Sequence, residues 1–287
     1  MQIMSPLRYP GGKAKLYPYV KKILVENNLD GSATYIEPFA GGAGLAIKLL
    51  FNNNVKRIII NDIDPAIYCL WHAIINHTDD FCNLIENTEL SINEWGKQKE
   101  IYKKADTSDL LVFAFSVFFL NRTNVSGVLK GGVIGGLEQK GTYKIDARFN
   151  KVRLKTLIKE IAIKKDMITI LNMDANDLMN EPIISRHNKV FVFFDPPYVN
   201  KGAQLYQNFF NKDDHKVLFK TISKCTKRWI TTYDMSNLIE GLYSKKYRGG
   251  KINLNYSVQT KRKENELIYF SRNLKIPDDY LNGTYII

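Results

Sequence analysis

Residues 190–198 read VFVFFDPPY, and this stretch decides the fold of the chain. The first five residues are all β-branched or aromatic, which is typical of a short strand buried on both faces of a parallel sheet. Asp195, Pro196 and Tyr198 then stand at the end of this strand, where open α/β sheets bind their ligands. The carboxylate and the Pro196 carbonyl can both accept hydrogen bonds from one amino group, and the Tyr198 ring offers a flat face. These groups suit the exocyclic amine of a nucleobase, and the alternative is an Asp-Pro that merely ends a strand.

A second strand-to-helix turn lies upstream, at residues 37–44, EPFAGGAG. Its glycines let the backbone approach a ligand closely, but the third glycine of the dinucleotide-binding fingerprint is missing. Asp62 ends the next predicted strand and lies 25 residues after Glu37. That spacing is near the offset at which an acidic residue binds ribose hydroxyls. The pattern favours a nucleoside ligand without a pyrophosphate, and the alternative is tight packing of a helix on a strand.

A third glycine-containing segment, residues 8–13 (RYPGGK), precedes a predicted helix from about residue 14 to residue 27. Glycines followed by Lys13 at the start of a helix suit an anionic group. The spacing of a Walker A loop is absent, which excludes that type of phosphate site. A solvated turn is the alternative interpretation.

Taken in order, four motifs resemble those of the Dam-like alpha group of N6-adenine DNA methyltransferases: YPGGK (9–13), EPFxGxxG (37–44), ND (61–62) and DPPY (195–198). The resemblance extends from Arg8 to about Phe270. It implies an α/β, Rossmann-like S-adenosylmethionine-dependent methyltransferase fold. This fold is a doubly wound, mostly parallel sheet with a closing antiparallel hairpin. It also implies transfer of a methyl group from S-adenosylmethionine to the N6 amine of an adenine that is flipped out of duplex DNA.

The resemblance also assigns roles residue by residue, and it implies no metal. The catalytic residues would be Asp195, Pro196 and Tyr198. The residues that bind S-adenosylmethionine would be Tyr9, Gly12, Lys13, Glu37, Phe39, Gly41, Asp62, Asp174 and Asp195. Lys13 is the candidate partner for the carboxylate of the cofactor, and Asp62 for its ribose hydroxyls. Asp174 would meet its adenine amino group, with Asp177 as a competitor and a helix N-cap as the alternative role of Asp174.

The order of predicted elements places an insertion after the second strand. Strands are predicted near 34–37, 57–60, 167–171, 190–194 and 228–232, with a closing hairpin at 252–258 and 267–270. A mainly helical block from about residue 65 to residue 120 separates the second strand from the third. In the resembled family the target recognition domain occupies this position. The resemblance therefore implies a catalytic domain of residues 1–65 and 151–287, and an inserted, mainly helical target recognition domain of residues 66–150.

Candidate DNA contacts lie in the insertion and in two basic clusters, at residues 245–251 and 261–263. Residues 121–136 are rich in glycine, so a hairpin or loop is more plausible there than a helix. Asparagine and arginine can read base edges bidentately, and lysine mostly neutralises phosphate. The residues assigned to DNA are Asn121, Arg122, Asn124, Lys130, Lys245 and Lys261. Lys261 is expected in the turn of the closing hairpin. The alternatives are an Arg122 paired with a core carboxylate, and lysines on a solvated face.

Composition bounds the remaining expectations. The formal net charge of +12 on 287 residues suggests a polyanionic partner, here double-stranded DNA. Three widely spaced cysteines form neither a metal site nor a disulfide framework, which fits a reducing cytoplasm in a bacterium or a phage host. We expect no signal peptide and no membrane span. We expect a monomer, with dimerisation on DNA as the alternative, and a cognate restriction endonuclease is a candidate partner.

Other functions remain as alternatives. An N4-cytosine DNA methyltransferase uses the same amine chemistry, but usually has serine in place of Asp195. Methyltransferases of RNA amines or of protein glutamine resemble Asn-Pro-Pro-Tyr enzymes and are further away. A catalytically inactive DNA-binding protein on a methyltransferase scaffold is the alternative of a different class. The intact Asp195, Tyr198, Lys13 and Asp62 argue against it.

Overall fold

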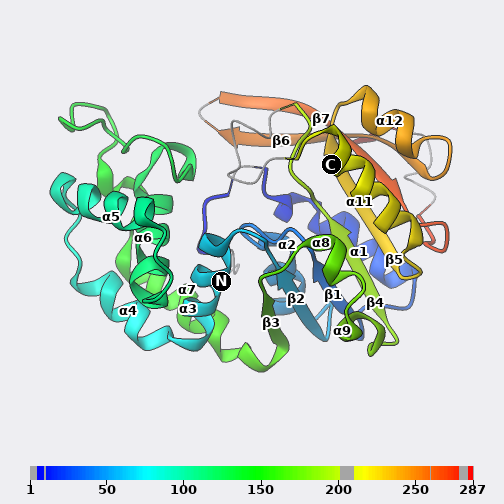
Figure 1. Cartoon of the computed structure of the whole chain (residues 1–287), viewed down its shortest axis with the longest axis horizontal. Helices are drawn as coiled ribbons and strands as arrows, with labels where there is room; N and C mark the ends of the chain where they lie inside the picture. Colours follow the sequence, from blue (N-terminus) through cyan, green and yellow to red (C-terminus); the bar gives the residue numbers. More distant parts are fainter. Residues whose placement is uncertain (1–4, 10, 201–209, 259, 278–283, 287) are drawn as a thin grey trace. The chain divides into compact units, whose positions relative to one another are not determined.

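The computed structural model describes residues 5–9, 11–200, 210–258, 260–277 and 284–286 (Figure 1), and for residues 253–264 and 284–286 it describes the backbone alone. The chain divides into two compact units. Unit 1 comprises Met1–Gly11 and Asp64–Ile170, and unit 2 comprises Gly12–Ile63 and Leu171–Ile287. The predicted boundaries of the catalytic domain and the target recognition domain stay predictions, because these units are defined by compactness and not by function.

The described residues form one eight-stranded sheet in the order β3-β2-β1-β4-β5-β7-β6-β8. The strands are β1 (Thr34–Glu37), β2 (Arg57–Asn61), β3 (Ile168–Leu171), β4 (Val190–Phe194), β5 (Arg228–Asp234), β6 (Arg248–Val258), β7 (Thr260–Phe270) and β8 (Thr284–Ile286). β1 runs parallel to β2 and β4, β4 runs parallel to β5, and β7 is antiparallel to both of its neighbours. The strand order reverses between β1 and β4, which is the topological switch point of a doubly wound fold. The predicted fold class is confirmed.

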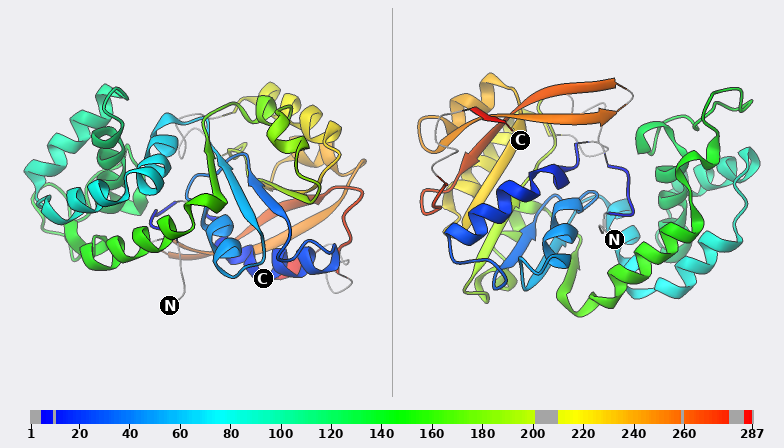
Figure 2. Two further views of the ribbon diagram at one scale, coloured as in Figure 1. Left: turned by 90° about the horizontal axis from the view of Figure 1, so that it is seen from below. Right: turned by 180° about the vertical axis from the view of Figure 1, so that it is seen from behind.

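The two faces of this sheet are covered by different helices of unit 2, because successive side chains of a strand point to opposite faces. Ile36 and Val192 belong to a core with α8, α9, α11 and α12, whereas Tyr35 and Phe191 stack with their ring centroids 6.1 Å apart. α1 and α2 lie on the face opposite α11 and α12 (Figure 2). The helices of unit 2 are η1 (Lys13–Leu16), α1 (Tyr17–Glu26), α2 (Gly44–Phe51), α8 (Ala175–Leu178), α9 (Pro182–Ser185), α11 (Lys212–Lys224) and α12 (Asn237–Tyr243).

Unit 1 is helical. Its α-helices are α3 (Pro65–Asn76), α4 (Thr78–Asn87), α5 (Ile92–Lys104), α6 (Leu110–Thr123) and α7 (Lys151–Ile163), and its short 3-10 helices are η2 (Val125–Gly127), η3 (Ile145–Arg148) and η4 (Lys165–Met167). α6 is apolar nearly all round and packs against α3, α4 and α5, as a buried central helix does. None of the helices in the described part of the chain is long and apolar enough to cross a membrane.

The closing hairpin is longer than the sequence predicts. β6 and β7 have 11 residues each, and their register runs from Arg248↔Phe270 to Val258↔Thr260. Lys261 therefore lies in β7 and not in the turn, so that part of the prediction is wrong. The sequence does not indicate this extension, because residues 253–264 are mostly polar and backbone pairing itself requires no apolar pattern. Gly249 allows the pairing, since a Cβ there would lie 2.3 Å from the ring of Tyr269.

The glycine-rich segment also differs at its start. α6 continues to Thr123, whose hydroxyl donates to the carbonyl of Phe119 at 2.7 Å, so a loop beginning at residue 121 is wrong. Asn124 then forms an antiparallel bridge with Val133, and the amide of Val125 donates to the carbonyl of Gly132 at 2.9 Å. The segment that follows is a loop closed by this isolated bridge, as the prediction of a hairpin or loop allows, but it starts three residues later.

Candidate active site

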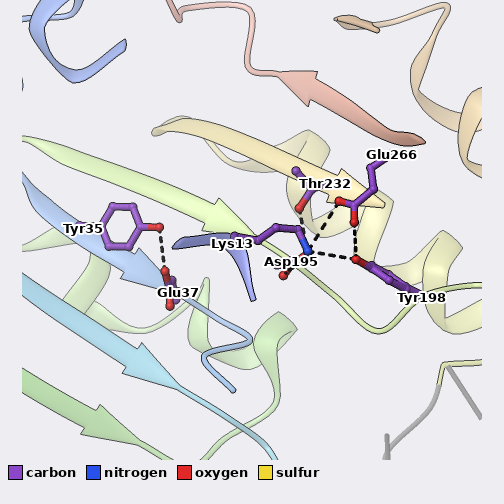
Figure 3. A network of polar contacts seen from close by, with 7 residues as sticks. All are labelled: Lys13, Tyr35, Glu37, Asp195, Tyr198, Thr232 and Glu266. Atoms are coloured by element: carbon purple, nitrogen blue, oxygen red, sulfur yellow. Dashed lines mark hydrogen bonds and ion pairs between the residues drawn. The ribbon is translucent and has the colours of Figure 1, made fainter. Parts of the chain in front are cut away.

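Five side chains from distant parts of the sequence form one polar network in unit 2, which we call the Lys13 cluster (Figure 3). Its members are Lys13, Asp195, Tyr198, Thr232 and Glu266. Asp195 follows β4, accepts a hydrogen bond from Thr232 Oγ1 at Oδ1 (2.8 Å), and lies 2.9 Å from Lys13 Nζ at Oδ2. Lys13 Nζ also donates to the hydroxyl of Tyr198 at 3.1 Å, and this hydroxyl donates to Glu266 Oε1 at 2.5 Å. Lys13 Nζ is 3.6 Å from Glu266 Oε2.

The Lys13 cluster is largely removed from water. The side chains of Lys13 and Glu266 are 4% and 2% exposed, and that of Asp195 is 22% exposed. Burial raises the pKa of Asp195 above its ordinary value, Lys13 counteracts that rise, and the negative charge of Glu266 adds to it. Asp195 is therefore a poorly solvated acceptor at the end of a strand, held in place by a cation and a hydroxyl.

The loop after β4 is anchored by Asp234, at the end of β5. The amides of Val199 and Asn200 donate to its two carboxylate oxygens, each at 2.9 Å. Pro196 is buried, and Tyr198 is buried with its hydroxyl in the Lys13 cluster. The sequence analysis missed Asp234 and Glu266. Asp234 could have been found as an acidic residue at the end of an apolar strand, whereas Glu266 gives no comparable signal.

Glu37 and Asp62 lie at the ends of β1 and β2 and have different environments. Glu37 Oε1 accepts hydrogen bonds from the Tyr35 hydroxyl (2.8 Å) and the Ala46 amide (3.1 Å), and burial raises its pKa to about 8. Asp62 is only partly buried, and its Oδ2 accepts from the Gly41 amide at 2.9 Å. Gly41 has φ of 44°, so this turn uses the left-handed region that glycine adopts readily.

The ends of β1, β2 and β3 are tied together by Asn61. Its Nδ2 donates to the carbonyls of Pro38 (3.0 Å) and Met173 (2.9 Å), and its Oδ1 accepts from the Met173 amide. Asp174 follows and caps α8 by accepting from the Asn176 amide at 2.7 Å. The N-cap role that the sequence left open for Asp174 is therefore present, and it leaves the carboxylate partly exposed.

The other residues predicted to bind the cofactor are scattered. Gly12 is exposed and precedes η1, with Lys13 in the Lys13 cluster. Phe39 is partly buried and packs edge-on against Phe210, with ring centroids 5.8 Å apart. Tyr9 is part of unit 1, whereas the remaining residues of this set belong to unit 2.

Two of the predicted DNA-binding amides are engaged within unit 1. Asn121 exchanges hydrogen bonds with the backbone of Arg8, at 2.8 Å each, and donates to the Gly127 carbonyl. Asn124 accepts from the Trp95 indole at 2.7 Å and donates to the carbonyls of Val128 and Leu129. Both side chains are buried, so in this structure neither amide is open to a base edge.

The basic residues predicted to contact DNA have different environments from one another. Arg122 donates to the backbone carbonyls of Arg148 and Pro6 rather than to a carboxylate. Burial, with neighbouring arginines, lowers its pKa to about 10. Lys130 and Lys245 are exposed, and the side chain of Lys261 lies outside those that the structure describes. The described residues hold no group of three or more His, Cys, Asp or Glu that suits a metal ion.

Comparison with known proteins identifies the family. A sequence model of the D12 class of N6 adenine-specific DNA methyltransferases matches residues 9–266. The chain belongs to this family. Type II methyltransferase M.MjaIII of Methanocaldococcus jannaschii is 27% identical over 270 residues, which cover 88% of this chain and 90% of that protein. Type II methyltransferase M.CviBI of Paramecium bursaria Chlorella virus NC1A is 27% identical over 232 residues, which cover 75% of this chain and 82% of that protein.

Membership in this family confirms the predicted function. The protein is an enzyme that transfers a methyl group from S-adenosylmethionine to the N6 amine of adenine in DNA. The N4-cytosine and inactive-scaffold alternatives are not favoured. The residues at the ends of β1 and β2 fit a nucleoside, because the carboxylate of Asp62 can accept hydrogen bonds from hydroxyls. Beside it, Ile63 is an apolar side chain that is 41% exposed, which suits a planar ring.

Proposed function

We propose that Asp195, with the Pro196 carbonyl and Tyr198, holds the target adenine for methylation. The observation that carries this proposal is the position of the Asp195 carboxylate at the end of β4, oriented by Thr232 and Lys13. A carboxylate that accepts a hydrogen bond from the N6 amine raises the electron density on that nitrogen and fixes its lone pair for attack. S-Adenosylmethionine supplies the methyl group on an activated sulfur, so the protein contributes position and charge.

The proton that the amine loses needs an acceptor. Asp195 is the nearest base that the proposal provides, and burial raises its pKa, which brings it closer to the range of an effective proton acceptor. Asp234 supports this step indirectly, because it holds the loop that follows Asp195. Flipping a base out of a duplex costs a few kcal/mol, and contact with an aromatic ring returns about 1–3 kcal/mol. In this proposal that ring is Tyr198.

The cofactor is proposed to bind over the ends of β1 to β3. Asp62 would accept hydrogen bonds from the ribose hydroxyls, and Asp174 would accept one from the adenine amino group. The remaining residues proposed to contribute to this site are Tyr9, Gly12, Lys13, Glu37, Phe39, Gly41 and Asp195. The support is the fixed carboxylate of Asp62 beside the Gly41 turn and the exposed Ile63 next to it.

The biological setting is proposed from the DNA substrate. Lys130 and Lys245 are exposed cations that would neutralise phosphates, and Arg122 and Lys261 remain candidates for DNA contact. Because both curated relatives named above are type II methyltransferases, a restriction endonuclease with the same target sequence is the proposed partner. The proposed location is the cytoplasm, for a bacterial or phage-encoded protein that associates with the nucleoid through its DNA substrate. A monomer is the proposed form.

A transfer assay tests the catalytic proposal. Wild-type protein is incubated with plasmid DNA and S-adenosylmethionine labelled in the methyl group, and the DNA is then hydrolysed to its bases. We expect N6-methyladenine from the wild type, and at least a thousandfold slower labelling by Asp195→Asn. Calorimetry should find S-adenosylmethionine bound by the variant within about tenfold of the wild-type affinity. N4-methylcytosine as the product would refute the adenine assignment, and near-normal turnover by Asp195→Asn would refute the role of Asp195.

A further inference from the structure

Glu266 is the most deeply buried acid of the Lys13 cluster, and no step of the proposed reaction uses it. It lies in β7, opposite Asp234 of β5 and Ile252 of β6, and its side chain is 2% exposed. A carboxylate at that depth destabilises the folded protein unless a cation and hydrogen bonds compensate for its lost hydration. Its position inside a sheet, facing the reacting groups, therefore points to an electrostatic task.

The Lys13 ammonium lies between two carboxylates at unequal distances. Nζ is 2.9 Å from Asp195 Oδ2 and 3.6 Å from Glu266 Oε2. The hydroxyl of Tyr198 connects both sides, since it accepts from Lys13 and donates to Glu266. In this arrangement Lys13 forms its shorter ion pair with the same carboxylate that the target amine needs.

The second carboxylate, Glu266, can balance the positive charge of Lys13. The amine nitrogen becomes positively charged as it bonds to the methyl group, and Asp195 stabilises that charge only if its own charge is not taken up by Lys13. The Lys13 cluster holds two carboxylates and one ammonium group. A movement of Nζ by about 1 Å would bring it within hydrogen-bonding distance of Glu266 Oε2.

We propose that Glu266 is the counter-ion of Lys13 in the reacting complex, and that it thereby leaves Asp195 to the target amine. Glu266 is a positioning residue in this scheme, because it acts through Lys13 and Tyr198 and does not touch the substrate. The proposal rests on the proposed role of Asp195.

The substitution Glu266→Gln tests this proposal, because it keeps the shape and the oxygen that accepts from Tyr198 but removes the charge. Of the two carboxylates that lie near Lys13 Nζ in the Lys13 cluster, Asp195 then remains. We expect kcat to fall at least thirtyfold, whereas KM and Kd for S-adenosylmethionine change less than threefold. Asp213→Asn is the matched control, since it makes the same chemical change on an exposed carboxylate of α11 and should leave all values within twofold.

A double-mutant cycle with Lys13→Met separates this role from a structural one. If Glu266 acts by balancing the charge of Lys13, then Glu266→Gln should cost less than threefold in kcat when Lys13 is already Met. An equal cost in both backgrounds would overturn the proposal. Circular dichroism and urea unfolding show whether each variant is folded.

A binding measurement gives a readout that needs no turnover. Two duplexes are compared. At the position that the wild-type enzyme methylates, one carries adenine and the other carries unsubstituted purine, which lacks the N6 amine. With S-adenosylhomocysteine present, the wild type should prefer adenine, and Glu266→Gln should lose at least fivefold of that preference. An unchanged preference in a folded variant refutes the role of Glu266. If the wild type does not methylate adenine at all, the proposed function itself fails, and this proposal fails with it.

Discussion

Glu37→Gln should stabilise the protein, and the gain should grow with pH. Glu37 is buried at 6% exposure, and burial raises its pKa from 4.5 to about 8. Because the folded protein holds this proton more tightly than the unfolded chain does, the free energy of unfolding falls as the pH rises from about 4.5 to about 8. A shift of about 3.5 units corresponds to about 5 kcal/mol at full ionisation, and to about 3 kcal/mol at pH 7. Glutamine cannot ionise, and its oxygen can still accept from Tyr35 and Ala46.

The assay is urea unfolding of wild type and Glu37→Gln at pH 5, 7 and 8.5, followed by circular dichroism. The difference in the free energy of unfolding should rise by about 3–5 kcal/mol between the lowest and highest pH. Glu26→Gln, at an exposed position in α1, is the control and should change it by less than about 0.5 kcal/mol. If the difference in the free energy of unfolding stays constant with pH, then the pKa of Glu37 is not raised in the folded protein. Because Glu37 is mostly protonated at pH 7, cofactor binding should not need its charge. The variant should therefore bind S-adenosylmethionine within about threefold of wild type.

Three further substitutions test other parts of the molecule. Asp62→Ala should weaken S-adenosylmethionine by about tenfold to a hundredfold, the equivalent of about 1.5–3 kcal/mol, and calorimetry showing equal affinity would exclude its role. Asn121→Ala should lower the free energy of unfolding by about 1–3 kcal/mol, because it strands backbone groups of Arg8 and Gly127, and an unchanged urea midpoint would contradict this. Replacing Lys130 and Lys245 by alanine should weaken all DNA sequences alike and reduce the salt slope by about one per lost phosphate contact, whereas a changed sequence preference would contradict it.

The strand ends could be predicted because their signals are local. An apolar run such as residues 190–194 identifies a buried strand, and the residue that follows it must lie at the rim of the sheet. Asp195 and Asp62 were found in this way, and the structure places both at the carboxyl ends of their strands. The fold class followed from the order of such runs.

The partners of these residues could not be predicted, because they depend on long-range register. Tyr198 and Glu266 are 68 residues apart, and Lys13 and Tyr198 are 185 residues apart. Glu266 is brought to the Lys13 cluster by the antiparallel pairing of β7 with β5, and its polar neighbours in the sequence do not indicate a buried strand. The role of Asn121 could not be predicted for the same reason. An amide that reads a base and an amide that binds buried backbone look alike in sequence, and the choice depends on Arg8, 113 residues away.

The proton on Glu37 and the charge of the Lys13 cluster belong to one electrostatic balance. The negative charge of Asp195 raises the pKa of Glu37, and the positive charge of Lys13 lowers it. With Glu37 neutral, the Lys13 cluster sets two carboxylates, Asp195 and Glu266, against one ammonium group, Lys13. In the proposed mechanism a positive charge develops on the amine nitrogen beside Asp195, and a preorganised excess of carboxylate over ammonium groups would stabilise it there. A third carboxylate charge would instead favour protonation of Asp195, which would then no longer accept from the amine. The burial that raises the pKa of Glu37 to about 8 would thus keep Asp195 available for its proposed role.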